Sequence, residues 1–271
     1  MKKYRVEPGE TVKLRDLDPS DNGKMTGDVG KAKAELDTAK LCAKLERLQE
    51  LLYATGTHAL LVVLQAMDAG GKDGTVKHVM EGLNPAGVRV VSFKAPTPEE
   101  LGHDFLWRVH AQVPRKGMIG IFNRSHYEDV LITRVHGLVS DKAAEKRFRN
   151  INDFERLLTE SGTVIQKFFL HISKDEQRQR MEDRLSDPEK HWKFNPGDLG
   201  ERDRWDDYME AYEEAISATS TKHAPWHVVP SNQKWYRNYV VASCLVDALE
   251  RLDLQFPPLP DNLKPSDIRI P

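Results

Sequence analysis

A glycine-rich segment with one lysine and two aspartates is the first part of the sequence whose residue types could do chemistry. It reads MDAGGKDGT over residues 67–75 and follows an apolar run. Its candidates for binding phosphate or a nucleotide are Gly70, Gly71, Lys72, Gly74 and Thr75. In a phosphate-binding loop, backbone N–H groups hold phosphate oxygens at a helix N-terminus and a lysine reaches the transferred group. The alternative is a plain glycine turn with an exposed lysine.

Two aspartates distinguish this segment from the usual loop pattern. Asp73 stands where Ser or Thr is normally found, and Ala66 replaces the first glycine. Asp68 and Asp73 would repel a phosphate unless a divalent cation lay between them, and Mg²⁺ binds through one or two carboxylates together with substrate phosphates. The alternative role is capping, because an acidic group near a helix N-terminus stabilises it by about 0.3–1 kcal/mol. The pair therefore suggests metal-bridged phosphate chemistry.

A second polar segment, NRSHYED over residues 123–129, follows the apolar run MIGIF. In proteins with phosphate-binding loops, the strand that carries the second metal motif usually ends in Asp. Here Asn123 takes that place and Arg124 follows, which resembles the strand end of nucleoside monophosphate kinases. Asn123 and Arg124 are candidates for binding phosphate or nucleotide, and for Arg124 a structural ion pair is the alternative.

A third segment, residues 174–205, combines a charged helix pattern with a loop that contains Pro and Gly. Its basic residues are Arg178, Arg180, Arg184, Lys190 and Lys193, among others. Basic segments of this kind form lids that close over phosphates and supply charge to the transition state. The alternative is a solvated helix with i,i+4 ion pairs. Arg184, at the junction of helix and loop, is the preferred catalytic candidate; Arg178, Lys193 and, in LITRVHG, Arg134 are candidates for binding phosphate.

Strands and helices alternate along the chain and must position these segments. Apolar runs predict strands at 59–65, 88–93, 118–122, 164–172 and 226–231. Helical spacing or composition predicts helices at 31–53, 98–113, 147–160, 174–185 and 234–252. This alternation predicts a three-layer α/β/α fold with a mostly parallel sheet and a helical lid.

The predicted organisation has three parts. Residues 1–30 are polar and rich in turn formers, which predicts an extended N-terminal arm. Residues 31–255 are expected to form one domain built on the phosphate-binding loop, with the lid at about 175–202, and residues 256–271 a Pro-rich tail.

Composition limits the classes of partner. The chain has 271 residues and a net charge of −2, so no overall field draws it to nucleic acid or to a membrane, and we expect neither as a partner. The two cysteines form no CxxC or disulfide pattern, which favours a reducing cytoplasm. The N-terminus lacks the apolar core of a signal peptide, and no apolar run is long enough to cross a bilayer. We therefore expect a cytoplasmic protein.

Several motifs in order resemble the polyphosphate kinase 2 family. They are MDAGGKDGT, LNPAGVRVVSFKAPTPEEL, DFLWRVH, FNRSHYEDVL and HISKDEQRQR, and the resemblance runs from Met1 to about Leu252. It implies a P-loop kinase fold that moves phosphoryl groups between inorganic polyphosphate and nucleotides, with Mg²⁺ or alternatively Mn²⁺. It also makes residues 123–129 the second phosphate-binding motif, with Arg124 as a phosphate clamp and Asp129 as a metal ligand or base. For Asp129, a surface acid or helix cap is the alternative.

The resemblance leads to a specific expectation about function. The chain is expected to phosphorylate AMP and ADP in turn from polyphosphate, reversibly, with Mg²⁺ bridging to Asp68 and Asp129. Glu128 in NRSHYEDVL favours the class that uses both acceptors. Asp73 would hold a second metal or orient Lys72. A homo-oligomer, dimer or tetramer, is expected from the family. Two alternatives remain: an ATP-dependent nucleoside monophosphate kinase, and a regulator that binds polyphosphate or nucleotide without turnover.

Overall fold

A five-stranded, wholly parallel sheet forms the centre of the protein in the computed structural model, which describes residues 1–260, 263, 266 and 268. The strand order is β2-β3-β1-β4-β5, as expected for a doubly wound α/β fold. β1 is buried along its whole length, because neighbours flank it on both sides and helices cover both faces. The strands are β1 (Ala59–Gln65), β2 (Val88–Ser92), β3 (Ile119–Asn123), β4 (Thr163–His171) and β5 (Trp226–Pro230).

Helices connect the strands and cover both faces of the sheet. The long ones are α1 (Gly27–Thr55), α6 (Asp141–Glu160), α7 (Lys174–Ser186), α9 (Trp205–Thr219) and α10 (Lys234–Glu250). The short ones are α2 (Lys72–Val79), α3 (Pro98–Leu101), α4 (Trp107–His110), α5 (Ile132–Val135) and α8 (Gly197–Asp203). The three-layer prediction is confirmed.

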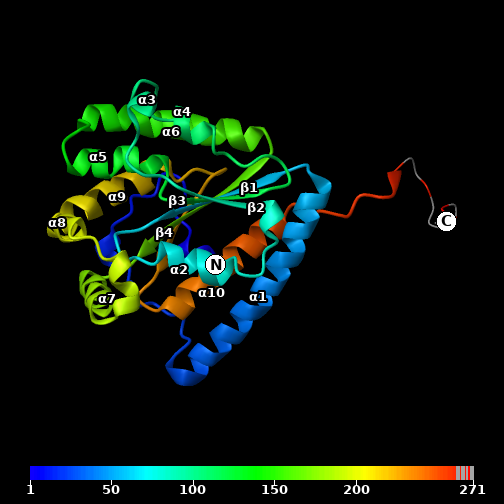
Figure 1. Cartoon of the computed structure of the whole chain (residues 1–271), viewed down its shortest axis with the longest axis horizontal. Helices are drawn as coiled ribbons and strands as arrows, with labels where there is room; N and C mark the ends of the chain where they lie inside the picture. The colour runs from blue at the N-terminus through cyan, green and yellow to red at the C-terminus, as the bar shows by residue number, and fades with distance from the viewer. Residues whose placement is uncertain (261–262, 264–265, 267, 269–271) are drawn as a thin grey trace.

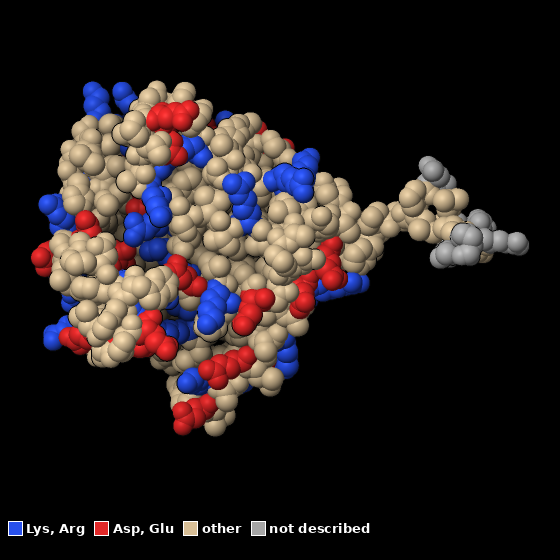
Figure 2. All heavy atoms as spheres, viewed as in Figure 1, with Lys and Arg blue, Asp and Glu red and all other residues tan. Residues whose placement is uncertain are grey.

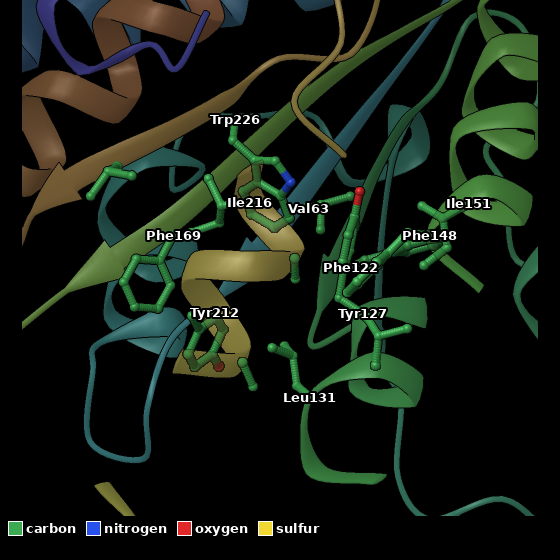
Figure 3. Close-up of a cluster of buried hydrophobic side chains, with 14 of the residues drawn as sticks. Val63, Phe122, Tyr127, Leu131, Phe148, Ile151, Phe169, Tyr212, Ile216 and Trp226 are labelled. Atoms are coloured by element: carbon green, nitrogen blue, oxygen red, sulfur yellow. The ribbon is translucent and has the colours of Figure 1, made fainter. Parts of the chain in front are cut away.

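Each face of the sheet has its own hydrophobic core. On one face, α1, α2 and α10 pack against the sheet through residues such as Leu45, Val79 and Val240. On the other, α6 and α9 contribute Phe148, Ile151, Tyr212 and Ile216, which surround Tyr127 and Trp226 (Figures 1 and 3). The two cores hold the carboxyl edge of the parallel strands in a fixed position between the helical layers.

One expected helix differs from the structure, and one observed helix was not expected. Residues 98–113 form two single turns, α3 and α4, instead of one helix. The break has a local cause, because the Asp104 side chain accepts a hydrogen bond from the Leu106 backbone N–H at 3.0 Å and starts a new turn. Helix α9, which is buried along one face, was not predicted at all.

The N-terminal arm is not a free extension. Tyr4, Val6, Val12 and Leu14 are buried. The Val6 backbone N–H donates to the Trp226 carbonyl at 2.9 Å, so the arm lies beside β5. The prediction that residues 1–30 form an extended arm was therefore incomplete: the first residues complete the core, and α1 already begins at Gly27.

The predicted tail, residues 256–271, lies partly outside the described residues. At its start, the Phe256 ring lies 4.4 Å from the Arg47 guanidinium, so this part contacts α1. Among the helices of the described residues, none combines the length and hydrophobicity needed to cross a membrane.

Candidate active site

The glycine-rich segment forms a tight loop between β1 and α2, at the carboxyl edge of the sheet. It turns at Gly70, whose backbone N–H donates to the Met67 carbonyl at 2.9 Å. A Cβ on Gly70 would lie 2.5 Å from the Ala66 Cβ, and Gly71 has φ +104°, a conformation that side chains rarely tolerate. Both glycines are therefore required by the loop, as expected where a backbone must approach a phosphate at a helix N-terminus.

Lys72 is the first residue of α2 and reaches back over the loop. Its Nζ donates to the Ala66 carbonyl at 2.7 Å. Burial lowers the pKa of this ammonium, Asp68 acts in the opposite direction, and Arg124 lowers the pKa further. A bound phosphate would replace a carbonyl partner with a negative charge and favour the ammonium form.

Two side-chain pairs connect the loop to the end of the neighbouring strand β3. Arg124 Nη2 donates to Asp68 Oδ1 at 2.8 Å, and Asn123 Nδ2 donates to Asp73 Oδ1 at 2.6 Å. Arg124 has φ +64°, an uncommon conformation for a residue with a side chain. The backbone at this strand end therefore turns sharply and directs the guanidinium to Asp68. The sequence-based expectation that both motifs meet at one site agrees with this geometry.

Glu128 lies close behind these pairs and strengthens their electrostatic coupling. Burial raises the pKa of its carboxyl, while Arg124 and Lys72 act to lower it. With its amide turned to donate to Glu128 Oε1 at 3.0 Å, Gln65 accepts from Ser125 Oγ at 3.1 Å. For Arg124, burial lowers the pKa, but the carboxylates of Glu128 and Asp68 outweigh it and the pKa is raised. The guanidinium therefore stays charged beside the loop.

The loop opens into a cavity of about 1430 Å³. Residues 68–74, Asn123 and Arg124 form one part of its wall, and α7, the loop after it and the start of α10 form another. Basic and acidic side chains alternate over the face seen in Figure 2, which fits the small net charge. The cavity lining itself carries ten Lys or Arg and seven Asp or Glu residues, so its excess of positive charge is local.

The segment predicted as a lid contributes Arg184 and Lys193 to this cavity. Arg184 Nη1 lies 3.8 Å from Asp198 Oδ2 and donates to the Lys193 carbonyl at 3.3 Å. Lys193 Nζ lies 4.9 Å from the ring centroid of Trp192, which is largely exposed and also lines the cavity. These side chains can approach a phosphate across the cavity from the loop.

Asp129 is not brought to Asp68. Its carboxylate lies 3.5 Å from Arg147 Nη1 and 3.9 Å from Arg108 Nη2, outside the residues that line the cavity. Burial raises the pKa of this carboxyl, and the two arginines act to lower it. The sequence placed Asp129 near the site but did not reveal these two partners.

Glu128, described above, and three other predicted residues also lie outside the cavity wall. Arg134 is paired with Asp141 at 2.8 Å and Glu214 at 2.7 Å. Arg178 makes an exposed i,i+4 pair with Glu182, which was the alternative considered for this helix. Thr75 is buried, and its hydroxyl donates to the Gly71 carbonyl at 3.1 Å. In these contacts the side chains support local structure rather than contact the site.

Two further arginines at the cavity were missed as site residues. Arg180 had been noted only as part of the basic segment, yet its Nη1 donates to the Ala69 carbonyl in the loop at 3.0 Å. Arg237, in the first turn of α10, was not considered. A signal existed: Arg237 occupies the same helical stripe as the buried Val240, Val241 and Cys244. A charged residue on an apolar helix face is a candidate for function.

A buried polar network anchors the second motif, residues 123–129, to the interior of the protein. Lys167 Nζ of β4 donates to Glu155 Oε2 at 2.5 Å, to Tyr127 Oη at 2.8 Å and to the Thr219 carbonyl at 2.8 Å. Tyr127 Oη in turn donates to Glu155 Oε1 at 2.8 Å. Burial would raise the pKa of Glu155, but Lys167 and His126 together outweigh this and lower it. The network fixes Tyr127, three residues after Arg124, to both β4 and α6.

The carboxylates at the cavity suit a metal that is shared with substrate. Within the described part of the chain, no three His, Cys, Asp or Glu side chains cluster as a complete protein-only metal site. Mg²⁺ does not require one, because it commonly binds one or two carboxylates together with phosphates and water. Asp68, at the loop and on the cavity wall, fits this role, and Asp73 lies on the same wall. Asp129 does not fit it in this geometry, because its carboxylate lies outside the residues that line the cavity and faces Arg108 and Arg147 instead.

Comparisons with known proteins identify the family of this chain. The family model described as polyphosphate kinase 2 matches residues 28–257. The AMP/ADP-polyphosphate phosphotransferase of Meiothermus ruber is 59% identical over 257 residues, covering 95% of this chain and 96% of that protein. The ADP-polyphosphate phosphotransferase of Rhodopseudomonas palustris is 47% identical over 226 residues, covering 79% of this chain and 78% of its own length.

A solved structure shows the same architecture. The crystal structure of polyphosphate kinase 2 from Arthrobacter aurescens TC1 matches with a TM-score of 0.92 and 50% identity, covering 97% of this chain and 93% of that one. The family match spans most of the chain and includes the glycine-rich loop, the second motif and the lid segment. The chain therefore belongs to the polyphosphate kinase 2 family.

Proposed function

We propose that this protein is a phosphotransferase that moves phosphoryl groups from inorganic polyphosphate to AMP and ADP, reversibly. One observation carries the proposal: the glycine-rich loop, Lys72 and the guanidinium of Arg124 line one cavity with the basic lid residues Arg184 and Lys193. A cavity of this size accommodates two phosphorylated reactants side by side. The relatives with the names given above support polyphosphate and adenine nucleotides as the two reactants.

The protein contributes to catalysis by positioning the reactants and by electrostatic stabilisation, and forms no covalent bond with them. The acceptor is a phosphate oxygen, already ionised near neutral pH, so a strong general base is unnecessary. Amides of the loop and Lys72 hold the donor phosphates, and Arg124, kept in place by Asp68, faces the charge that develops during transfer. Arg184 closes from the lid, adds positive charge and excludes water.

The metal belongs to the same proposal. Mg²⁺, or Mn²⁺ in its place, would be held by Asp68 and by substrate phosphates, and would neutralise phosphate charge during transfer. Asp73 is bonded to Asn123 and is available as a further ligand or as a charge beside Lys72. A metal-binding role for Asp129 would require Arg108 and Arg147 to release its carboxylate, and it stays a prediction.

The acceptor class follows from the relative that matches over almost the whole chain, whose name includes both AMP and ADP. Glu128, in the second motif, lies close enough to Arg124 and Lys72 to influence how an acceptor phosphate is held. A cytoplasmic location, the absence of nucleic acid as a partner, and assembly into dimers or tetramers stay predictions.

The test is donor choice. Purified protein is incubated with AMP or ADP, Mg²⁺ and polyphosphate without ATP, and nucleotides are separated by chromatography. ADP and ATP should form, and Lys72→Ala should abolish most of this activity, whereas Lys222→Ala, at an exposed position before β5, should not change it. Product formed only with ATP as donor would indicate a nucleoside monophosphate kinase. Binding without any product would indicate a regulator.

A further inference from the structure

Arg237 is a buried arginine without an acidic partner. The residue is 2% exposed, and its Nε and Nη2 both donate to Asn238 Oδ1, at 3.1 and 2.8 Å. Nη1 has no hydrogen-bond acceptor among the residues that the structure describes, and none of their carboxylates forms an ion pair with this guanidinium. Burial, and secondly the charge of Arg180, lower the pKa of Arg237 to about 10. An uncompensated buried charge is strongly unfavourable, so this guanidinium is suited to pair with an anion.

The free Nη1 is directed to the glycine-rich loop. A Cβ placed on Gly71 would lie 2.1 Å from Arg237 Nη1 and 3.4 Å from Arg180 Nη1, and a Cβ on Gly74 would lie 3.3 Å from Arg237 Nη2. Two guanidiniums therefore meet the loop backbone at Gly71. Arg180 is paired with Glu176 at 2.7 Å, which leaves one carboxylate for two cations. Both arginines line the cavity described above.

The two arginines approach the loop from the opposite side to Arg124. The loop follows β1, Arg124 follows β3, and Arg180 and Arg237 lie on the helices after β4 and β5. In the sheet order, β3 and β4 flank β1 on opposite sides. In-line phosphoryl transfer needs the attacking and leaving groups on opposite sides of the transferred group. If Arg124 faces one reactant, Arg180 and Arg237 face the other.

We propose that Arg237 and Arg180 form an anion subsite for the polyphosphate donor, holding the phosphate that follows the one in the glycine-rich loop. This inference rests on the proposed function, and it assigns a binding position to the part of the polyphosphate chain that lies beyond the loop. A nucleotide acceptor ends at its terminal phosphate, whereas a polymer continues beyond the loop. Lys234, one turn before Arg237, and Lys77 line the same cavity and extend the basic wall.

The subsite predicts a stability effect that separates it from a structural role. If Arg237 served the fold, its replacement would lower stability. If Arg237 instead binds a phosphate of the donor, Arg237→Met removes an uncompensated charge from the ligand-free protein. The ligand-free protein should then keep or gain stability, while polyphosphate should bind less tightly. Arg251→Met is the matched control, because Arg251 follows the same helix, is exposed and is paired with Asp247.

The experiment measures thermal unfolding and kinetics for the wild type, Arg237→Met, Arg237→Lys and Arg251→Met. For Arg237→Met, KM for polyphosphate should rise about tenfold or more, as expected for the loss of a charge-assisted hydrogen bond. KM for ADP should change less than about twofold, because ADP forms no hydrogen bond with Arg237 in this proposal. Tm without ligand should not fall by more than about 2 °C, and the rise in Tm on adding polyphosphate should shrink. Arg237→Lys should be intermediate, and Arg251→Met should match the wild type.

Three results would overturn the subsite. A large fall in the ligand-free Tm, or failure of Arg237→Met to fold, would make Arg237 a structural residue. A raised KM for ADP with an unchanged KM for polyphosphate would place the nucleotide there. An unchanged rise in Tm with polyphosphate would exclude contact. If the wild type formed no product from polyphosphate, the proposed function would fail, while the comparison of Tm with and without polyphosphate would still test the subsite.

Discussion

Replacing Glu155 by glutamine removes the one carboxylate that pairs with Lys167 in the described structure, and leaves the shape of the side chain nearly unchanged. Both groups are fully buried. The other two acceptors of Lys167 Nζ, Tyr127 Oη and the Thr219 carbonyl, are neutral, so neither compensates the ammonium charge. Breaking a buried ion pair from one side costs about 3–5 kcal/mol. We expect a loss near the lower end, because the glutamine amide can still form hydrogen bonds.

A loss of about 3 kcal/mol would be a large part of a typical folding free energy of about 5–15 kcal/mol. It corresponds to a fall in Tm of about 6–12 °C for a chain of this size. Urea unfolding followed by tryptophan fluorescence measures it directly, and Trp226 contributes to the signal, since Lys167 Nζ lies 5.3 Å from its ring. The loss should become smaller at alkaline pH, where Lys167, whose pKa burial already lowers, can deprotonate.

The matched control is Glu160→Gln, on the same helix α6. Glu160 pairs with Arg156 at 3.2 Å, but both side chains are more than half exposed. Its replacement should change the unfolding free energy by less than about 0.5 kcal/mol. If Glu155→Gln cost less than about 1 kcal/mol, or no more than this control, the buried pair could not be the anchor of the second motif.

Three further substitutions test other parts of the structure. Gly71→Ala should lower stability by about 1–3 kcal/mol and reduce activity, because φ is +104° and Arg237 leaves no room; Gly9→Ala, with φ +84° in open space, should reproduce the strain and keep activity. For His227, burial lowers the pKa from 6.5 to about 4, so its contribution to stability is present above pH 6.5 and lost on acidification. His227→Gln should therefore reduce the difference in unfolding free energy between pH 7 and pH 4 by about 3 kcal/mol, and an unchanged difference would contradict this. For Glu128, burial raises the pKa, so stability falls as pH rises through it; Glu128→Gln should be more stable than the wild type at pH 8 and equal near pH 4, and equality at both pH values in urea unfolding would refute the assignment.

The fold was predictable because its signals are local. A strand buried on both faces gives a continuous apolar run, and β1 was assigned at residues 59–65 on that basis. The glycine-rich turn and Arg124 at a strand end also followed from short stretches. α9 was missed because its sequence mixes acids and aromatics, and its burial depends on packing against α6. The sequence pattern within residues 205–219 alone did not identify this partner.

The site was predictable only in part, because several of its contacts join distant segments. The direction of the Asp129 side chain depends on Arg108 and Arg147, which belong to two other helices. Arg237 lies more than 160 residues after Gly71, and their contact exists only once α10 has packed beside α2. A motif gives the residue types of a site, but the partners that orient or neutralise each charge come from the assembled layers.

The contact between the first residues and β5 has a consequence for biosynthesis. Val6 bonds to Trp226, and the Ser220 hydroxyl donates to the Val6 carbonyl at 2.7 Å, so the two sides of this contact are more than 200 residues apart. A ribosome makes the first side long before the second, and contacts of such separation form slowly. Until β5 has been synthesised, water surrounds the side chains of Val6, Val12 and Leu14. Chaperones or other nascent chains can bind them during this time. The first residues can take up their native contacts only after Ser220 and β5 have been synthesised.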